Sequence, residues 1–134
     1  MDAATRDLVR QRAGDRCEYC RIPQQATPFI PFHVEHIIAK QHLEDVDDDL
    51  SGLAYACDRC NAFKGPNLSS IDPETGDKVD VFNLRTNVWS DHFDVSEGKV
   101  VGLSPIGRAT ARLLNMNHPR RVELRQQWLD EGET

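Results

Sequence analysis

The sequence contains no apolar run that approaches the roughly 20 residues needed to cross a membrane. Its N-terminal segment, MDAATRDLVRQRAGDRC, carries acidic and basic residues early and lacks the apolar core of a secretion signal. Internal repeats and low-complexity tracts are also absent. We therefore expect a cytoplasmic protein with no membrane partner. At 134 residues, the chain has the length of one domain and can bury a core of ordinary size.

Positive charge is not in excess, because 16 Lys and Arg residues face 22 Asp and Glu residues, for a net charge of −6. This balance disfavours broad, non-specific attraction to nucleic acid. Arginines nevertheless gather near both ends of the sequence, where they either form a basic face for phosphate or are solvated on amphipathic helices. Both interpretations stay open for Arg6, Arg10, Arg12, Arg16 and Arg21, and for Arg108, Arg112, Arg120, Arg121 and Arg125.

Periodicity and turn residues predict helices at ATRDLVRQRAGDRC, SPIGRATARLLNM and HPRRVELRQQWLDEG, with Thr5 as the N-cap of the first. FHVEHII and LAYAC are expected to be extended, and NVWSDHFDV and GKVVGL to be two strands around Glu97-Gly98. The acidic segment 44–49 lacks the spacing of a calcium loop and is expected to be solvated. In the last helix, four apolar residues are available for burial: Val122, Leu124, Trp128 and Leu129.

The four cysteines form two CxxC pairs. A two-residue gap lets both thiolates reach one ion from a tight turn, and two such turns complete a tetrahedral zinc site. A reducing cytoplasm opposes disulfides, and a redox CxxC would explain one pair and leave the other idle. We therefore predict a structural Zn²⁺ ion. Because four thiolates leave no open coordination position, any chemistry must lie elsewhere. The predicted ligands are Cys17, Cys20, Cys57 and Cys60.

Between the two pairs, the segment FHVEHII places His33, Glu35 and His36 among apolar residues. On an ideal strand, Glu35 and His36 point to opposite faces, so they share one site only where the strand bends or ends. His33 shares the face of Glu35 and is either a metal ligand, a phosphate contact or a structural histidine. His42 is expected at the surface, and His92 is expected to be structural or exposed.

The motifs CEYC, VEHII, DDLSGLAYAC and CDRCNAFKG follow one another between Cys17 and Gly65. A CxxC, an acid–His pair on a strand, an acidic loop, a second CxxC and then Asn and Lys on a helix resemble the HNH nuclease family, in a bacterial subgroup with a four-cysteine zinc site. The resemblance implies an α+β fold, in which a zinc-stapled ββα-metal (HNH) core carries additional C-terminal strands and helices. We expect a single domain, 1–134, with its core at about 15–66 and the C-terminal extension at about 67–134.

The resemblance also implies a metal-dependent endonuclease that hydrolyses DNA phosphodiester bonds and leaves 5′-phosphate and 3′-hydroxyl ends. By position, His36 matches the general base, and Glu35 and Asn61 match the ligands of a catalytic Mg²⁺ or Mn²⁺ ion, with His33 as a further candidate ligand. Lys64 matches a lysine that would contact substrate phosphate. Carboxylate and amide oxygens suit a hard cation, and a histidine near neutral pKa can accept a proton from water. The competing interpretation of Asn61 is a residue that hydrogen-bonds only locally at the helix start.

Gly52 departs from the family pattern, because relatives often read DDLSNL where this chain reads DDLSGL. The asparagine is the middle letter of HNH, and it is thought to hold the active-site loop and orient the general base. Glycine has no side chain for that purpose. A second hypothesis therefore accompanies the endonuclease: a zinc-stabilised module that binds nucleic acid or protein and is catalytically weak or inactive.

Overall fold

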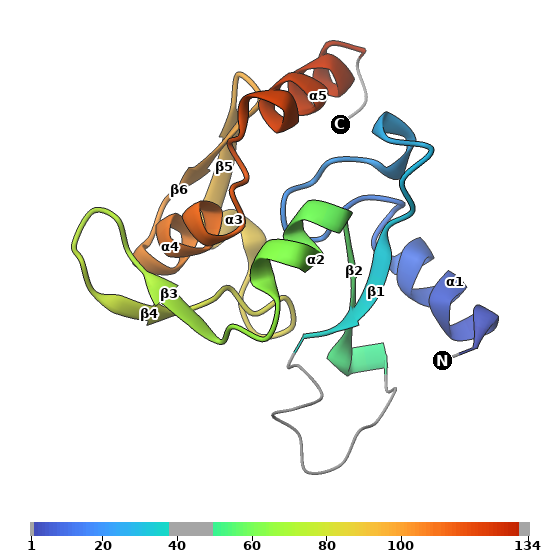
Figure 1. Ribbon diagram of the computed structural model, residues 1–134, viewed down its shortest axis with the longest axis horizontal. Helices are drawn as coiled ribbons and strands as arrows, with labels where there is room; N and C mark the ends of the chain where they lie inside the picture. The colour runs from blue at the N-terminus through green and yellow to red at the C-terminus, as the bar shows by residue number, and fades with distance from the viewer. Residues whose placement is uncertain (1, 38–49, 132–134) are drawn as a thin grey trace.

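The computed structural model describes residues 2–37 and 50–131, which form helices and small antiparallel sheets (Figure 1). The predicted α+β fold class is confirmed: the described residues form three two-stranded sheets and five α-helices. Two short 3₁₀ helices, η1 (Gln24–Ala26) and η3 (Leu50–Gly52), precede the strands of the first sheet. The predicted solvated segment 44–49 and His42 lie outside the described residues. In the described part of the chain, no helix is long and apolar enough to span a membrane.

Helix α1 (Ala3–Arg12) begins at Asp2, whose carboxylate accepts a hydrogen bond from the backbone N–H of Thr5 at 2.8 Å. The prediction that Thr5 caps this helix is wrong. Asp2 supplies the acceptor three residues earlier, on an extended residue where an N-cap must lie. The helix ends just before Gly14, which adopts a left-handed φ of +66° that glycine tolerates without steric cost.

Strands β1 (His33–His36) and β2 (Leu53–Ala56) pair antiparallel, with His33 opposite Ala56 and His36 opposite Leu53. β2 is buried along its whole length, because all four residues of LAYA are apolar enough to lie in the core. Helix α2 (Asp58–Lys64) follows at once, ends at Gly65 with a φ of +48°, and packs against β1. This hairpin and helix form the predicted ββα unit.

The C-terminal extension contains one hairpin that the sequence did not indicate. Strands β3 (Ser69–Ile71) and β4 (Lys78–Asp80) pair antiparallel and turn through ETGDK, where Gly76 has a φ of +80°. The predicted strands around Glu97-Gly98 are confirmed as β5 and β6, but the preceding Trp89–His92 forms the short helix α3. The bounds are β3 (Ser69–Ile71), β4 (Lys78–Asp80), β5 (Phe93–Ser96), β6 (Lys99–Gly102), α4 (Pro105–Leu113) and α5 (Pro119–Asp130).

Polar and aromatic contacts join the extension to the ββα unit. The indole N–H of Trp89 donates to the Tyr19 carbonyl at 2.9 Å, and the Trp89 ring packs on Phe93 with ring centroids 5.1 Å apart. Arg85 donates to the Glu18 carboxylate at 3.0 Å and to the Leu53 carbonyl at 2.7 Å. Strand β2 and the first cysteine turn are therefore held by residues that come much later in the chain.

Helix α5 does not bury the face that its apolar residues predicted. The candidates for burial, Val122, Leu124, Trp128 and Leu129, are all only half-buried. Instead, Arg121 and Arg125 point into the protein and are 5% and 1% exposed. Because a buried guanidinium needs hydrogen-bond acceptors and counter-charge, these two positions identify an unusual environment beneath the helix.

The β3–β4 turn is anchored by Asp72, a fully buried carboxylate. Arg108 on α4 donates to both of its oxygens, from Nε at 3.0 Å and from Nη2 at 2.8 Å. The Glu74 backbone N–H and the Thr75 hydroxyl donate as well, at 3.0 and 3.1 Å. These donors, with Arg108 contributing most, hold the pKa of Asp72 well below its usual value.

We expect Asp72→Asn to destabilise the protein at neutral pH, because an amide cannot accept the paired hydrogen bonds of a carboxylate. Since the folded-state pKa is lowered, this contribution is complete above the ordinary pKa of 3.8 and is lost as the pH falls below it. Urea unfolding from pH 7 to pH 3 should therefore show wild type and variant converging only below about pH 4. Glu74→Gln, at an exposed partner of Arg108, is the control with a small expected effect. A constant gap down to pH 3 would contradict the assignment.

Candidate metal centre and active site

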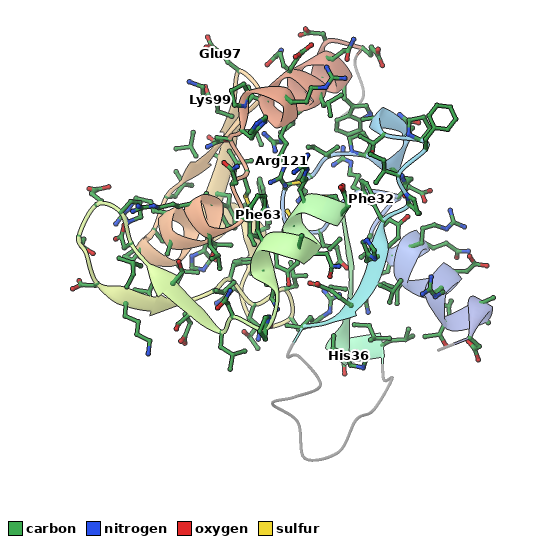
Figure 2. The ribbon with its side chains drawn as sticks, viewed as in Figure 1. Phe32, His36, Phe63, Glu97, Lys99 and Arg121 are labelled. Carbon is green, nitrogen blue, oxygen red and sulfur yellow. The ribbon has the colours of Figure 1, made fainter. Side chains whose placement is uncertain are left out.

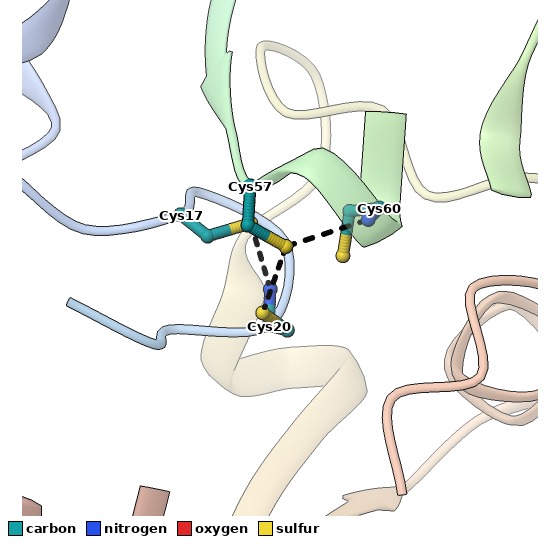
Figure 3. Close-up of side chains that lie close together, drawn as sticks. All are labelled: Cys17, Cys20, Cys57 and Cys60. Carbon is teal, nitrogen blue, oxygen red and sulfur yellow. Dashed lines mark hydrogen bonds between the residues drawn. The ribbon is translucent and has the colours of Figure 1, made fainter. Parts of the chain in front are cut away.

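The four cysteines come together as two turns that face each other (Figure 3). Their sulfur atoms all lie within 4.8 Å of one another, and the thiols are buried and form no disulfide. The Sγ atoms of Cys20 and Cys57 are 3.7 Å apart. Four sulfurs at about 2.3 Å from a central ion in a tetrahedron are separated by about 3.8 Å. The cluster therefore has the dimensions of a four-thiolate site.

Each turn is organised by backbone hydrogen bonds to its own sulfur. The N–H of Cys20 donates to Cys17 Sγ at 3.5 Å, and the N–H of Cys60 donates to Cys57 Sγ at 3.4 Å. Cys57 is at the same time the N-cap of α2. The cluster fits a structural zinc ion held by all four predicted ligands, and it leaves no position at which a substrate could bind the ion.

Arg121 contacts this cluster, and sequence reasoning did not predict it. Its Nη2 lies 2.8 Å from Cys60 Sγ and 3.6 Å from Cys57 Sγ, and Figure 2 shows it between α5 and α2. Burial opposes its charge, but the sulfurs of Cys60, Cys20 and Cys57 outweigh this and raise the pKa of Arg121. Burial also opposes ionisation of Cys20, yet its hydrogen-bonded cysteine neighbours and Arg121 hold the pKa of this thiol well below normal.

Glu35, the predicted metal ligand on β1, is largely buried, and its Oε1 atom has no hydrogen-bond partner among the described residues. Burial raises its pKa to about 7, although the positive charge of Lys64 opposes the shift. The buried Tyr19 hydroxyl, which has no other partner in the described chain, lies next to Glu35 and, like Lys64, opposes the rise in the Glu35 pKa. A buried, unpaired carboxylate oxygen is costly, and a bound cation would satisfy it.

Lys64, predicted to contact phosphate, is only 2% exposed. Its ammonium group donates to the backbone carbonyl of Ile37 at 2.8 Å, at the point where β1 ends. Lys64 thus ties the C-terminal end of α2 to the end of the strand that carries Glu35 and His36. Its nearby charge also favours the ionised form of Glu35. Contact between Lys64 and substrate phosphate stays a prediction.

The remaining predicted site residues lie on the ββα unit. His33 is exposed at the start of β1, and His36 is half-buried at the end of the strand, away from Arg121 in Figure 2. Asn61 is half-buried in the middle of α2, the helix that packs on β1. No contact joins His36, Glu35 and Asn61 directly among the described interactions, so their joint role as a catalytic set stays a prediction. His92, expected to be structural or exposed, is half-buried, and its Nδ1 lies 2.6 Å from the Ser104 hydroxyl.

Two of the ten arginines near the two ends of the sequence are removed from any basic face, and three others have partners within the protein. Arg121 and Arg125 are buried. Arg16 lies over the ring of Trp128 and Arg21 over that of Trp89, with distances of 4.0 and 4.7 Å to the ring centroids. Arg108 is paired with Asp72. Packing and internal charge pairing therefore account for these five side chains, and the phosphate-face interpretation is wrong for the two that are buried.

Comparison with known proteins agrees with this geometry. The family model of the HNH endonucleases matches residues 17–66, from the first zinc-site cysteine to just beyond the end of α2. Over this segment the chain is similar to the HNH endonucleases. No curated protein and no solved structure gave a significant match to the chain. The HNH match covers the two cysteine turns, both strands of the first sheet and α2, and the extension lies outside it.

We expect Glu35→Gln to stabilise the zinc-loaded protein at pH 8 by about 1–3 kcal/mol in buffer without other divalent ions. The amide avoids placing an unpaired charge in a buried position. Because the folded-state pKa of Glu35 is raised from 4.5 to about 7, wild-type stability falls as the pH rises through that window. The gain should therefore vanish near pH 4 in urea unfolding curves. Glu123→Gln, at an exposed carboxylate, is the matched control, and equal stability of Glu35→Gln and wild type at pH 8 would refute the expectation.

Proposed function

We propose that this protein is a metal-dependent endonuclease that hydrolyses DNA phosphodiester bonds at the end of β1. The observation that carries the proposal is the unpartnered carboxylate oxygen of Glu35, buried on the β1 strand of an HNH domain. A fold without a use for a cation at this point would gain stability from a neutral or apolar residue. Keeping an acid there is the pattern of a site whose geometry serves chemistry at some cost in stability.

Glu35 and Asn61 would hold a divalent ion, Mg²⁺ or Mn²⁺, through one carboxylate and one amide oxygen. When bound, such an ion supplies positive charge that stabilises the negative charge developing on the phosphate and on the leaving oxygen. Two protein ligands leave several coordination positions for water and substrate. Lys64 acts as a positioning residue in this scheme, because its charge favours ionised Glu35 and its hydrogen bond fixes the end of β1.

His36 would act as the general base. Its neutral imidazole accepts a proton from the attacking water, and the oxygen then attacks phosphorus in line with the departing 3′ oxygen. The products carry a 5′-phosphate and a 3′-hydroxyl. His36 is the last residue of β1, opposite Leu53, at the end of the hairpin where the strands connect, and a strand end relaxes the strict alternation of side chains.

The substrate is proposed to be DNA that is recognised by local contacts and not by a broad electrostatic field. The net charge of −6 disfavours general attraction to the phosphate backbone. In addition, Arg108 is paired with Asp72, and Arg121 and Arg125 are buried, so these three arginines are not available to contact phosphate. Binding is therefore expected to depend less steeply on salt than that of a strongly basic nuclease.

We expect His36→Ala to lower plasmid nicking by at least about 100-fold, because general-base catalysis contributes on the order of 10²–10⁴ in rate. Purified zinc-loaded protein is assayed with Mg²⁺, with Mn²⁺ and without either ion, in buffer free of chelators that would strip zinc. His33→Ala is the companion variant: full activity excludes a ligand role for this exposed histidine. Unchanged nicking by His36→Ala, with zinc content and folding preserved, would leave the non-catalytic binding module as the better account.

Gly52 favours that second function, and it also offers a direct test. A Cβ built at Gly52 meets nothing within 4 Å among the described atoms, and the residue does not have a left-handed φ. Its carbonyl accepts the Ile37 N–H at 2.9 Å, one residue beyond His36. An asparagine side chain would therefore fit beside the general base without displacing the backbone.

We expect Gly52→Asn to raise the nicking rate about 3- to 10-fold, a gain of roughly 1 kcal/mol in transition-state stabilisation, because the amide can hydrogen-bond the active-site loop. Gly52→Ala fills the same space without an amide and is the matched control, with little change expected. Single-turnover rates on a nicked-product assay compare the three proteins. Equal rates for the Asn and Ala variants would show that backbone groups already perform the function of the missing asparagine.

A further inference from the structure

Helix α5 carries two buried cations, one turn apart, that have no carboxylate partner in the described part of the chain. Arg121 and Arg125 are 5% and 1% exposed, and neither forms a salt bridge with Asp or Glu in residues 2–37 and 50–131. Fully buried arginines are rare unless they are paired, because the loss of hydration costs several kcal/mol per ion. The compensating negative charge must therefore come from another source.

The contacts of the two guanidinium groups lead to the cysteine cluster. Arg121 lies 2.8 Å from Cys60 Sγ through Nη2, and its Nη1 donates to the Leu114 and Asn115 carbonyls. Arg125 donates from Nε to the Cys20 carbonyl at 2.9 Å, and its other nitrogens donate to the Gly98 and Met116 carbonyls. Arg121 therefore contacts a cysteine sulfur directly, and Arg125 donates a hydrogen bond to the backbone of a cysteine turn.

The charges balance only in one state of the cluster. Four thiolates around one Zn²⁺ carry a net charge of −2, which two guanidinium groups neutralise. Without the ion, neutral thiols carry no charge, and a single thiolate such as that of Cys20 would offset only one of the two buried cations. Carbonyl oxygens satisfy the N–H groups in either state but supply no counter-charge. The arrangement therefore matches the zinc–thiolate form specifically.

We propose that Arg121 and Arg125 are the counter-ions of the zinc–thiolate centre, so that zinc retention and the docking of α5 are thermodynamically one event. Zinc binding favours the docked state of α5. By linkage, the docked helix raises the affinity for zinc by the same factor. Partners in the outer shell of a metal typically change its affinity 10- to 100-fold. The proposal concerns the structural metal and is independent of the nuclease activity.

The direct test measures zinc affinity by competition with a chromogenic chelator on the full chain. Arg121→Gln, which keeps hydrogen bonding and removes charge, is expected to weaken zinc binding at least 10-fold, and Arg121→Lys, which keeps the charge, to lose less. Arg120→Gln is the matched control, because Arg120 lies on the same helix, is 62% exposed and pairs with Glu123 in the next turn. Equal zinc affinity of the Arg121→Gln and Arg120→Gln variants would overturn the proposal.

A stability measurement separates the counter-ion role from simple packing. Arg121→Met should lower the stability of the zinc-loaded protein and raise that of the zinc-free protein, because the buried charge is compensated only in the first state. Loss of packing alone would destabilise both states. A lower stability of Arg121→Met in both states therefore counts against the proposal.

A measurement on wild type keeps the proposal falsifiable if the variants fail to fold. Hydrogen exchange of the α5 amides is followed while zinc is titrated into zinc-free protein. Protection of α5 that rises in proportion to zinc occupancy supports the coupling. Protection of α5 that is already complete without zinc would overturn it.

Discussion

The four-sulfur cluster is the constraint on which the rest of the structure depends. It joins two turns that are 37 residues apart, as the Cys20–Cys57 contact shows, and α2 begins at one of its members. A zinc ion in such a site contributes on the order of 10 kcal/mol, which is comparable to the whole stability of a small domain. The β1–β2 hairpin lies between the turns in sequence, so closing the cluster also fixes where β1 ends and which residues meet there.

The cysteine cluster and the site of Glu35 on β1 differ in whether their buried charges are neutralised. Around the sulfurs, buried positive groups meet a centre that can carry matching negative charge. Beside β1, one carboxylate oxygen of Glu35 is buried without a full partner, and Lys64 and Tyr19 only partly offset the cost of its charge. The first arrangement is typical of a structural element, in which the positive and negative charges neutralise each other within the protein. The second leaves a deficit that a cation can fill, which is the signature of a site held ready for a ligand.

Local features of the sequence predicted the elements near the metal well. Spacing alone identified Cys17, Cys20, Cys57 and Cys60 as one cluster, because the two-residue gap within each pair depends on short-range geometry. The α5 interior could not be predicted this way. The pattern of Val122, Leu124 and Trp128 favoured an apolar face, but a centre more than 60 residues earlier made arginine the better side chain at two core positions. Long-range electrostatics of this kind leaves no periodic trace in a sequence.

The contact between Arg121 and Cys60 spans 61 residues, so the ribosome adds Cys60 to the chain well before Arg121. Domains begin to fold from the N-terminal end while the chain is still emerging. Both cysteine turns are available as soon as residue 60 has emerged, whereas α5 (Pro119–Asp130) is synthesised later. A nascent protein therefore passes through an interval in which a metal-loaded centre lacks its neutralising partners and exposes its sulfurs to solvent. Helix α5 covers the cluster only after it has itself been synthesised, and the cysteines are most open to metal loss and thiol oxidation in the interval before it docks.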